Sequence, residues 1–201
     1  MEAEQRAAAR FKQIAGKHEM TVLRDDGLYR HLRFKRPDEL TYWFDLVTWP
    51  GYLAINGDLV SGYTFSRIED MFRFFQYRSD VHGQFRINPH YWSEKITNYD
   101  AMKGTRVYSE AALHNHVKEA LRNMAESEGV GLPVLEKEWR EHVQYFDLSI
   151  EGWARQAIDD FRYMGRGFVD AWEWDLTEWS YPFLLCCHAI GWGIRRYRGE
   201  R

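Results

Sequence analysis

Basic and aromatic side chains alternate along one short segment, the first place in this sequence where chemistry could occur. They are Tyr29, His31, Arg33 and Lys35, and Arg36 follows. In a β-strand these alternate positions share one face, because successive side chains point to opposite sides of the sheet. The cations could bind phosphate groups while the tyrosine ring stacks on a base. The alternative, which is the more common case, is the solvated outer face of an antiparallel sheet.

A second candidate site combines the turn Asn56-Gly57-Asp58 with Ser66 and Arg67. Glycine allows backbone amides to approach a ligand closely. A serine that opens a helix marks an N-terminus, where anions are favoured, and the neighbouring arginine would add a positive charge. The alternative is a hairpin turn and a helix cap with purely structural roles. The ligand-binding candidates are thus Tyr29, His31, Arg33, Lys35, Asn56, Asp58, Ser66 and Arg67.

The histidines do not form a recognisable metal-binding pattern. His114 and His116 are two residues apart on a predicted helix, so they point in different directions. Glu138 and His142 have a spacing that could share a metal, but exposed pairs at that spacing are frequent. No Cys/His zinc spacing is present. A site built from dispersed ligands such as Asp45, Asp58 and His90 has no sequence argument behind it, so we predict no metal and no cofactor.

The sequence also lacks the motifs of nucleophilic and phosphate-transfer enzymes, such as GxSxG, the Walker loop, GxGxxG and the kinase set. Cys186 and Cys187 are adjacent in an apolar run, where burial raises the thiol pKa. Neighbouring cysteines seldom satisfy disulfide geometry. We therefore predict that both are reduced and buried, as in a cytosolic protein. Whether the chain is an enzyme stays open, with the missing motifs favouring the answer no.

Aromatic residues gather near the C-terminus and form a further candidate. They are Trp172, Trp174, Trp179, Tyr181, Phe183 and Trp192. If some of them are exposed, they could form a surface for a protein partner or a stacking pocket. The alternative, and the more common use of such residues, is a packed core.

The elements that must position these residues begin with a run of predicted strands. A hairpin over residues 20–35 turns at Asp25-Asp26-Gly27. Residues 42–49 alternate with both faces largely apolar, which is typical of a central strand covered on both sides. Residues 52–55 and 62–65 complete an antiparallel meander of about five strands. The sheet part covers about residues 19–66.

Helices are predicted for the remainder, about residues 67–201. Ser66 to Glu69 fits a capping box that opens an amphipathic helix, and Asn88-Pro89 begins another with Trp92 and Ile96 on its buried side. Further helices begin at Ser109, Pro133, Ser149 and Asp175 or Ser180. Residues 78–87 could be a mobile loop. We predict a single α+β domain over residues 1–201, with the C-terminal helices packed on the sheet.

Composition limits the classes of function. The chain has 201 residues, a net charge of −3 and a pI near 6.2, which argues against a general nucleic-acid-binding protein. Its nine tryptophans are a high number for this length. The N-terminus does not read as a secretory signal. The most apolar segment, residues 179–194, is shorter than the ~20 residues that span a bilayer. We predict a soluble protein that does not contact a membrane.

Two residue runs are similar to a known group of sequences. The run TWPGYLAINGDLVSGYTFSRIEDMFRFFQYR, followed by INPHYWSEKI, resembles small uncharacterised proteins encoded by tailed bacteriophages and prophages. The similarity extends more weakly to the segment WDLTEWSYPFLLCCHAIGWGIRRY. The resemblance implies a phage origin and a place of action in the host cytoplasm, but it carries over no catalytic residue. The residues it emphasises are Gly57, Asp58, Phe65, Ser66, Arg67, Asp70, Asn88, Pro89, Tyr91 and Trp92.

Three hypotheses of function follow from these observations. The first is a phage-encoded accessory protein that acts by binding, either sequestering a nucleotide-type ligand or engaging a host protein such as a defence factor. The second is an enzyme acting on a nucleotide or nucleic acid, in which His31, His90 or His116 meets Asp58 or Asp70 in a cleft. The third is a virion structural protein, which would be a homo-oligomer with a large apolar surface.

Overall fold

The computed structural model describes residues 3–60, 62–76, 86–99 and 104–199. The chain forms two compact units, one made of Met1–Thr105 with Trp179–Arg201 and one made of Arg106–Glu178. The α+β class is confirmed, because an antiparallel sheet precedes most of the helices. The prediction of a single domain over residues 1–201 stays a prediction. The polar segment expected over residues 78–87 lies mostly outside the described residues.

The first unit is built on a sequential antiparallel sheet of six strands, and five of them were predicted. The strands are β1 (Glu19–Asp26), β2 (Tyr29–Lys35), β3 (Phe44–Trp49), β4 (Tyr52–Gly57), β5 (Tyr63–Ser66) and β6 (Ile96–Tyr99). Gly27 and Gly51 occupy the first two tight turns with φ of 59° and 83°. Such left-handed turn positions favour glycine because it has no Cβ to clash. The predicted turns therefore set the order of the strands.

The sixth strand corrects the helix predicted after Asn88. The start was right, because Asn88 accepts a hydrogen bond from the amide of Tyr91 at 3.0 Å and Pro89 follows. The helix α3 is short, however, and ends at Ser93 (Pro89–Ser93). Ile96 belongs to β6, where it pairs with Phe65 of β5. A strand edge left open by β5 outweighs the helical pattern of this segment, since it offers backbone partners to residues 96–99.

The helix predicted at Ser66 is also corrected. Ser66 is the last residue of β5, and its amide donates to the carbonyl of Lys95 at 2.9 Å. Its backbone therefore continues the sheet. The short helix α2 (Met71–Phe74) begins after Asp70, whose carboxylate accepts from the amide of Phe72 at 3.1 Å.

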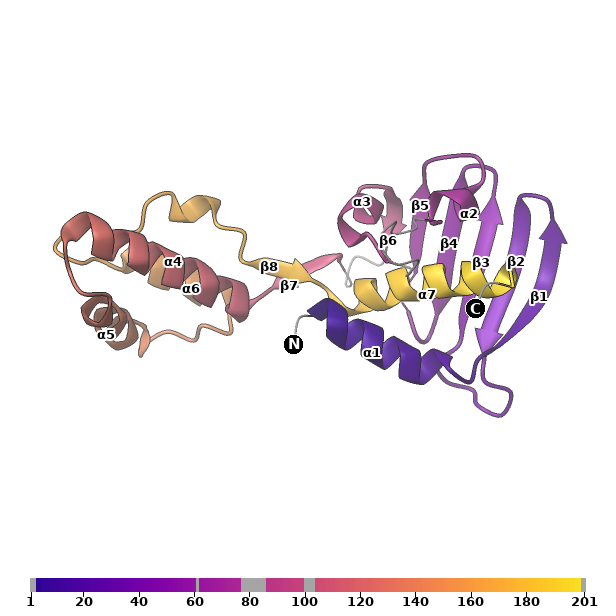
Figure 1. The fold of residues 1–201 in the computed structure, drawn as a ribbon, viewed down its shortest axis with the longest axis horizontal. Coiled ribbons are helices and arrows are strands. Elements are labelled where there is room, and N and C mark those ends of the chain that lie inside the picture. Colours follow the sequence, from indigo (N-terminus) through magenta and orange to yellow (C-terminus); the bar gives the residue numbers. More distant parts are fainter. Residues whose placement is uncertain (1–2, 61, 77–85, 100–103, 200–201) are drawn as a thin grey trace. The chain divides into compact units, whose positions relative to one another are not determined.

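Two helices cover one face of the sheet, as Figure 1 shows. They are α1 (Ala3–Ala15) and α7 (Tyr181–Tyr197), and they also pack on each other. Their apolar side chains meet the inner-facing residues of the strands, including Leu32, Phe34, Phe44, Leu46, Leu53, Ile55 and Phe65. Cys186 and Cys187 are free, fully buried thiols of α7, and burial raises the pKa of both.

The second unit has its own core. Its elements are β7 (Arg106–Tyr108), α4 (Glu110–Glu128), α5 (Leu132–Val143), α6 (Glu151–Asp160), the 3-10 turn η1 (Ala171–Glu173) and the first two residues of β8 (Thr177–Trp179). Ser109 caps α4 as predicted, and Gly129 ends it at φ 66°. Leu113, Val117 and Leu121 of α4 pack against residues of α5 and α6. The strands β7 and β8, which pair with each other, were not predicted.

In the part of the chain that the structure describes, no helix combines the length and apolarity needed to cross a membrane.

Candidate functional site

The four residues predicted on β2 do share one face of that strand. Tyr29, His31, Arg33 and Lys35 alternate with Leu32 and Phe34, which are fully buried under the helices. Asp45 of β3 lies opposite Arg33 in the antiparallel register.

Asp45 binds two of the predicted residues. The Arg33 side chain donates from Nε to Oδ1 at 2.9 Å and from Nη2 to Oδ2 at 2.8 Å, and His31 Nε2 lies 2.8 Å from Oδ2. Asp45 is only 8% exposed, and burial by itself would raise the pKa of its carboxyl group. The hydrogen bonds and charges of Arg33 and His31 outweigh burial, so the pKa is lowered below its usual range. The carboxylate is therefore ionised at neutral pH, and both basic side chains are engaged by it.

A small cavity of about 180 Å³ lies beside this cluster. Its walls include Arg33, Lys35 and Trp43, and the guanidinium of Arg33 lies over the Trp43 ring at 5.0 Å. Lys35 makes no hydrogen bond or ion pair with any described residue. The cavity therefore combines one unpaired cation with an aromatic ring, although its volume suits a small group only.

Two residues of the second candidate site, Gly57 and Asp58, have clear structural roles. A Cβ at Gly57 would lie 2.3 Å from the carbonyl oxygen of Trp43, so only glycine fits the close approach of β3 and β4. Asp58 accepts a hydrogen bond from the amide of Tyr42 at 2.7 Å, which supports that residue at φ 61°. Asn56 and Arg67 are exposed side chains. With Ser66 in β5, these residues are not gathered at a helix N-terminus.

The histidines have partners different from those expected. His31 meets Asp45 instead of Asp58 or Asp70, and His90 lies 3.4 Å from Glu94 on an exposed helix surface. His142 donates to the carbonyl of Ala157 at 2.8 Å, so its ring faces α6. Among the described residues, no group of three or more His, Cys, Asp or Glu side chains could hold a metal ion.

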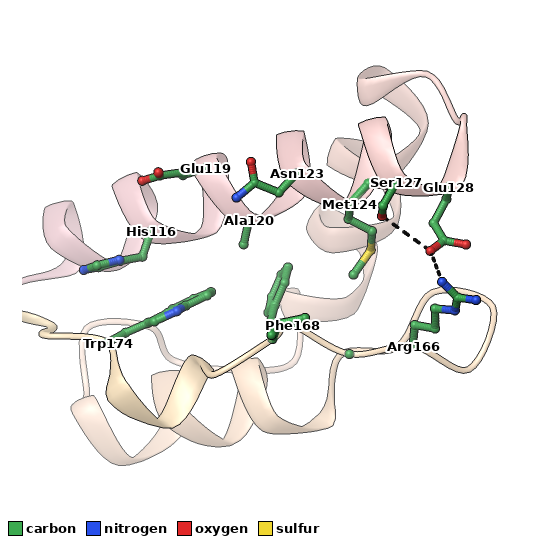
Figure 2. Close-up of a pocket in the computed structure, with 12 residues that line it drawn as sticks. His116, Glu119, Ala120, Asn123, Met124, Ser127, Glu128, Arg166, Phe168 and Trp174 are labelled. Atoms are coloured by element: carbon green, nitrogen blue, oxygen red, sulfur yellow. Dashed lines mark hydrogen bonds and ion pairs between the residues drawn. The ribbon is translucent and has the colours of Figure 1, made fainter.

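A larger site lies entirely within the second unit. It is a groove of about 830 Å³, shown in Figure 2. One wall is a face of α4, with His116, Glu119, Ala120, Asn123, Met124, Ser127 and Glu128. The other wall comes from the segment after α6, with Arg166, Gly167, Phe168, Val169 and Trp174. We call this site the α4 groove.

Aromatic rings form one end of the α4 groove. His116 stacks on Trp174 with ring centroids 5.4 Å apart and an interplanar angle of 12°. The His116 ring also donates from Nε2 to the carbonyl of Asp175 at 3.2 Å. In Figure 2 the Phe168 side chain points from the second wall toward α4, and its ring packs on those of Trp174 and Phe161 at centroid distances of 5.3 and 4.9 Å. Each ring is thus held by neighbours, so the apolar surface is largely preformed.

The opposite end of the groove carries an ion pair. Arg166 Nη1 contacts Glu128 Oε1, and Ser127 Oγ donates to the same oxygen at 3.4 Å. Arg166 closes a tight turn in which it exchanges two backbone hydrogen bonds of 2.9 Å with Tyr163. Met164 and Gly165 form the tip at φ 50° and 82°. The groove therefore runs from an aromatic end to an ionic end (Figure 2).

The sequence singled out only two residues of this groove, His116 and Trp174. The late aromatic residues divide among several environments: Trp174 lines the groove, Trp172 is 75% exposed, and Phe183 is buried in the first unit. Small and polar side chains recur every three or four residues on α4, from His116 to Ser127. This stripe was the sequence signal from which the groove could have been predicted, but the same pattern is typical of an ordinary solvated helix face.

Comparisons with known proteins returned no matching family, no matching curated protein and no matching solved structure. The resemblance to phage proteins therefore stays a prediction, and the site is interpreted from its own geometry.

Proposed function

We propose that this protein acts by binding, and that the α4 groove is its ligand site. The observation that carries the proposal is a groove of about 830 Å³ with an aromatic end. Ligand sites are commonly concave, about 300–1,000 Å³ in volume, and lined by apolar and aromatic side chains with a few polar groups. The α4 groove has each of these properties.

The rigidity of the groove supports the same proposal. Trp174, Phe168 and His116 contact one another or the unit's core, and the Arg166 turn is closed by paired hydrogen bonds. A site that is ordered before the ligand arrives loses less conformational entropy on binding. The polar side chains along α4, such as Asn123 and Glu119, can then fix the orientation of the ligand.

The resemblance to phage-encoded proteins supports a bacterial host component as the ligand. On this proposal the protein is an accessory factor that works inside the infected cell, and sequestration of a host molecule would be its effect. A defence factor is one such component.

A groove-filling substitution tests the proposal. Ala120 lines the groove, so Ala120→Trp should occupy it. Ala111→Trp is the matched control, because Ala111 is exposed on the same helix and does not line the groove. We expect the neutral dye Nile red to fluoresce with the parent chain and with the control, and to lose most of this signal with Ala120→Trp. Equal dye binding by all three proteins would contradict the proposal.

Native mass spectrometry of the same three proteins, purified from bacterial cells, provides a second reading. A mass that co-purifies with the parent chain and the control, but not with Ala120→Trp, would identify the natural ligand.

The cavity beside Asp45 supports a second candidate, a nucleotide-type ligand. Trp43 could stack on a base while Lys35 binds phosphate, because Lys35 is the cation without a partner there among the described residues. Lys35→Ala should then weaken ATP binding at least fivefold, with a reduced salt dependence. Lys12→Ala is the control, because Lys12 is an exposed side chain on α1. ATP affinity that is unchanged by Lys35→Ala would exclude this candidate.

A further inference from the structure

We infer that the occupant of the α4 groove is an extended segment of a partner protein that carries a basic side chain. This inference rests on the proposed function and names the chemistry of its ligand. Four properties of the groove lead to it: its length, the free backbone of one wall, its charge, and its apolar middle.

The length of the groove suits a short peptide. The lining residues of α4 run from His116 to Glu128, and at ~1.5 Å per helical residue this stretch is roughly 18 Å long. An extended chain covers ~3.3 Å per residue, so roughly five or six residues would fill it. A single planar ring would occupy only one part of a groove of this length.

One wall offers backbone groups to such a peptide. Gly167, Phe168 and Val169 belong to no helix or strand. Their amide N–H groups donate no hydrogen bond to any residue that the structure describes. Extended peptides often bind by adding a strand beside a free backbone segment, where main-chain hydrogen bonds supply affinity. Figure 2 shows this wall running alongside α4, which leaves the groove between them.

The charge of the lining favours a basic residue. Glu119 and Glu128 are the acidic residues of the lining, and Arg166 is its fully charged basic residue. Arg166 is paired with Glu128, whereas Glu119 forms no ion pair within the described residues. A lysine or arginine of the peptide would complement Glu119. A polyphosphate would instead be repelled by this carboxylate.

The apolar middle of the groove provides the complementary contact. Met124 and Phe168 lie between its two ends, and Val169 beside them is 81% exposed. One apolar side chain of the peptide would bury this surface. Because strand side chains alternate, an apolar and a basic residue two positions apart would both face α4.

The test uses the full chain and fluorescein-labelled hexapeptides from a positional-scanning library, with anisotropy as the readout. We expect selected peptides to combine one apolar residue with a lysine or arginine. Glu119→Lys should weaken their binding at least tenfold, and replacing the peptide's basic residue by glutamate should restore most of the loss. Glu126→Lys is the control, since Glu126 is exposed on the same helix outside the groove.

Backbone pairing is tested by N-methylation of the peptide, one amide at a time. We expect losses of tenfold or more at alternate positions and small effects at the positions between them. Losses that follow side-chain identity alone, with no effect of N-methylation, would overturn strand addition.

The outcomes separate this inference from the proposed function. If Nile red binds in the groove but no peptide competes with it, the peptide inference is wrong and the binding site stands. Displacement of the dye by adenosine or AMP, but by no peptide, would also overturn the inference and indicate a nucleotide ligand. Peptides that bind Ala120→Trp as well as the parent chain would overturn the inference, and the proposed site would fall with it only if Nile red also bound all three proteins equally.

Discussion

At the scale of single residues, the outer sheet face shows how a pattern that looks like a ligand site can serve the fold. Arg33 and His31 alternate on β2 as a phosphate-binding surface would, yet both are bound to the nearly buried Asp45. A buried carboxylate must be paired and hydrogen-bonded, because an isolated charge is costly to remove from water. Arg33 and His31 therefore help to hold β2 and β3 together through Asp45.

Arg33→Ala should destabilise the protein even if no ligand binds to the outer face of the sheet. The substitution leaves Asp45 with His31 as its main partner, and we expect a loss of about 1–3 kcal/mol in the free energy of unfolding. Lys35→Ala is the matched control on the same strand face, with an expected change within about 0.5 kcal/mol. Urea unfolding of the two variants measures both. If Arg33→Ala changed the free energy of unfolding as little as Lys35→Ala does, the contacts of Arg33 with Asp45 would contribute little to stability.

His188 on α7 predicts a pH dependence of stability. Its Nε2 atom is buried and has no hydrogen-bond partner among the described residues, and burial lowers its pKa from 6.5 to about 4. Between these values the unfolded chain binds a proton that the folded chain does not. Stability contributed by neutral His188 is therefore complete above pH 6.5 and is lost as the pH falls toward 4.

We expect this loss to be on the order of 3 kcal/mol at pH 4, from the size of the pKa difference. His188→Leu should remove that share of the pH dependence, while leaving the share due to carboxylates such as Asp45. Chemical unfolding at pH 7, 6, 5 and 4 compares the two proteins. If the free energy of unfolding changed with pH in the same way for both proteins, the prediction would be wrong.

At the scale of elements, the close approach of helix α7 to the sheet depends on one glycine. A Cβ at Gly193 would lie 2.7 Å from Leu46 Cδ1 and 3.1 Å from the Phe34 ring. All three residues lie in a close-packed core, which has little space to relax. The absence of a side chain at this position therefore lets the helix lie directly on β2 and β3.

Gly193→Ala should lower the melting temperature, because overpacking typically costs about 1–3 kcal/mol and exceeds the gain in helix propensity of about 1 kcal/mol. Gly152→Ala on α6 is the matched control, since a Cβ there would meet nothing within 4 Å. We expect that variant to be unchanged or slightly stabilised. Thermal unfolding followed by circular dichroism measures the change in melting temperature of both variants. A higher melting temperature for Gly193→Ala would show that the core adjusts freely.

At the scale of the whole molecule, the described residues form two separate hydrophobic cores. The first core joins the sheet with α1 and α7, and the second joins α4, α5 and α6. The chain enters the second unit after Thr105 and returns to the first at Trp179. The element that completes the first unit is thus separated from it in sequence by the whole of the second.

Each core should therefore respond to its own substitutions. Leu113 of α4 is fully buried, and Leu113→Ala should cost about 2–5 kcal/mol. We expect hydrogen exchange to accelerate in α4, α5 and α6, while the amides of β3 and α7 keep their protection. Leu46→Ala is the reciprocal experiment, with the opposite pattern. Equal loss of protection in both units would support one cooperative domain, as the sequence predicted.

Local signals predicted much of the fold and little of the groove. The turns at Gly27 and Gly51 and the caps at Asn88 and Ser109 were identified from their own residue types, and Ser180 was one of two starts considered for the last helix. These signals are reliable because each depends on neighbours in the sequence. The boundaries near Ser66 and Ile96 were wrong because a strand edge, formed by distant residues, offers hydrogen bonds that helical propensity does not anticipate.

The sequence by itself determined the α+β class, the order of most strands, and the helices that follow, since alternation, periodicity and capping are local properties. Only the tertiary structure decided what the polar residues do. It placed Asp45 where it engages Arg33 and His31. It also brought the segment of Arg166 and Phe168 beside His116 and Asn123, some 40 to 50 residues earlier in the chain, to form the α4 groove. No local pattern links residues that far apart, because their proximity follows from the packing of the helices between them.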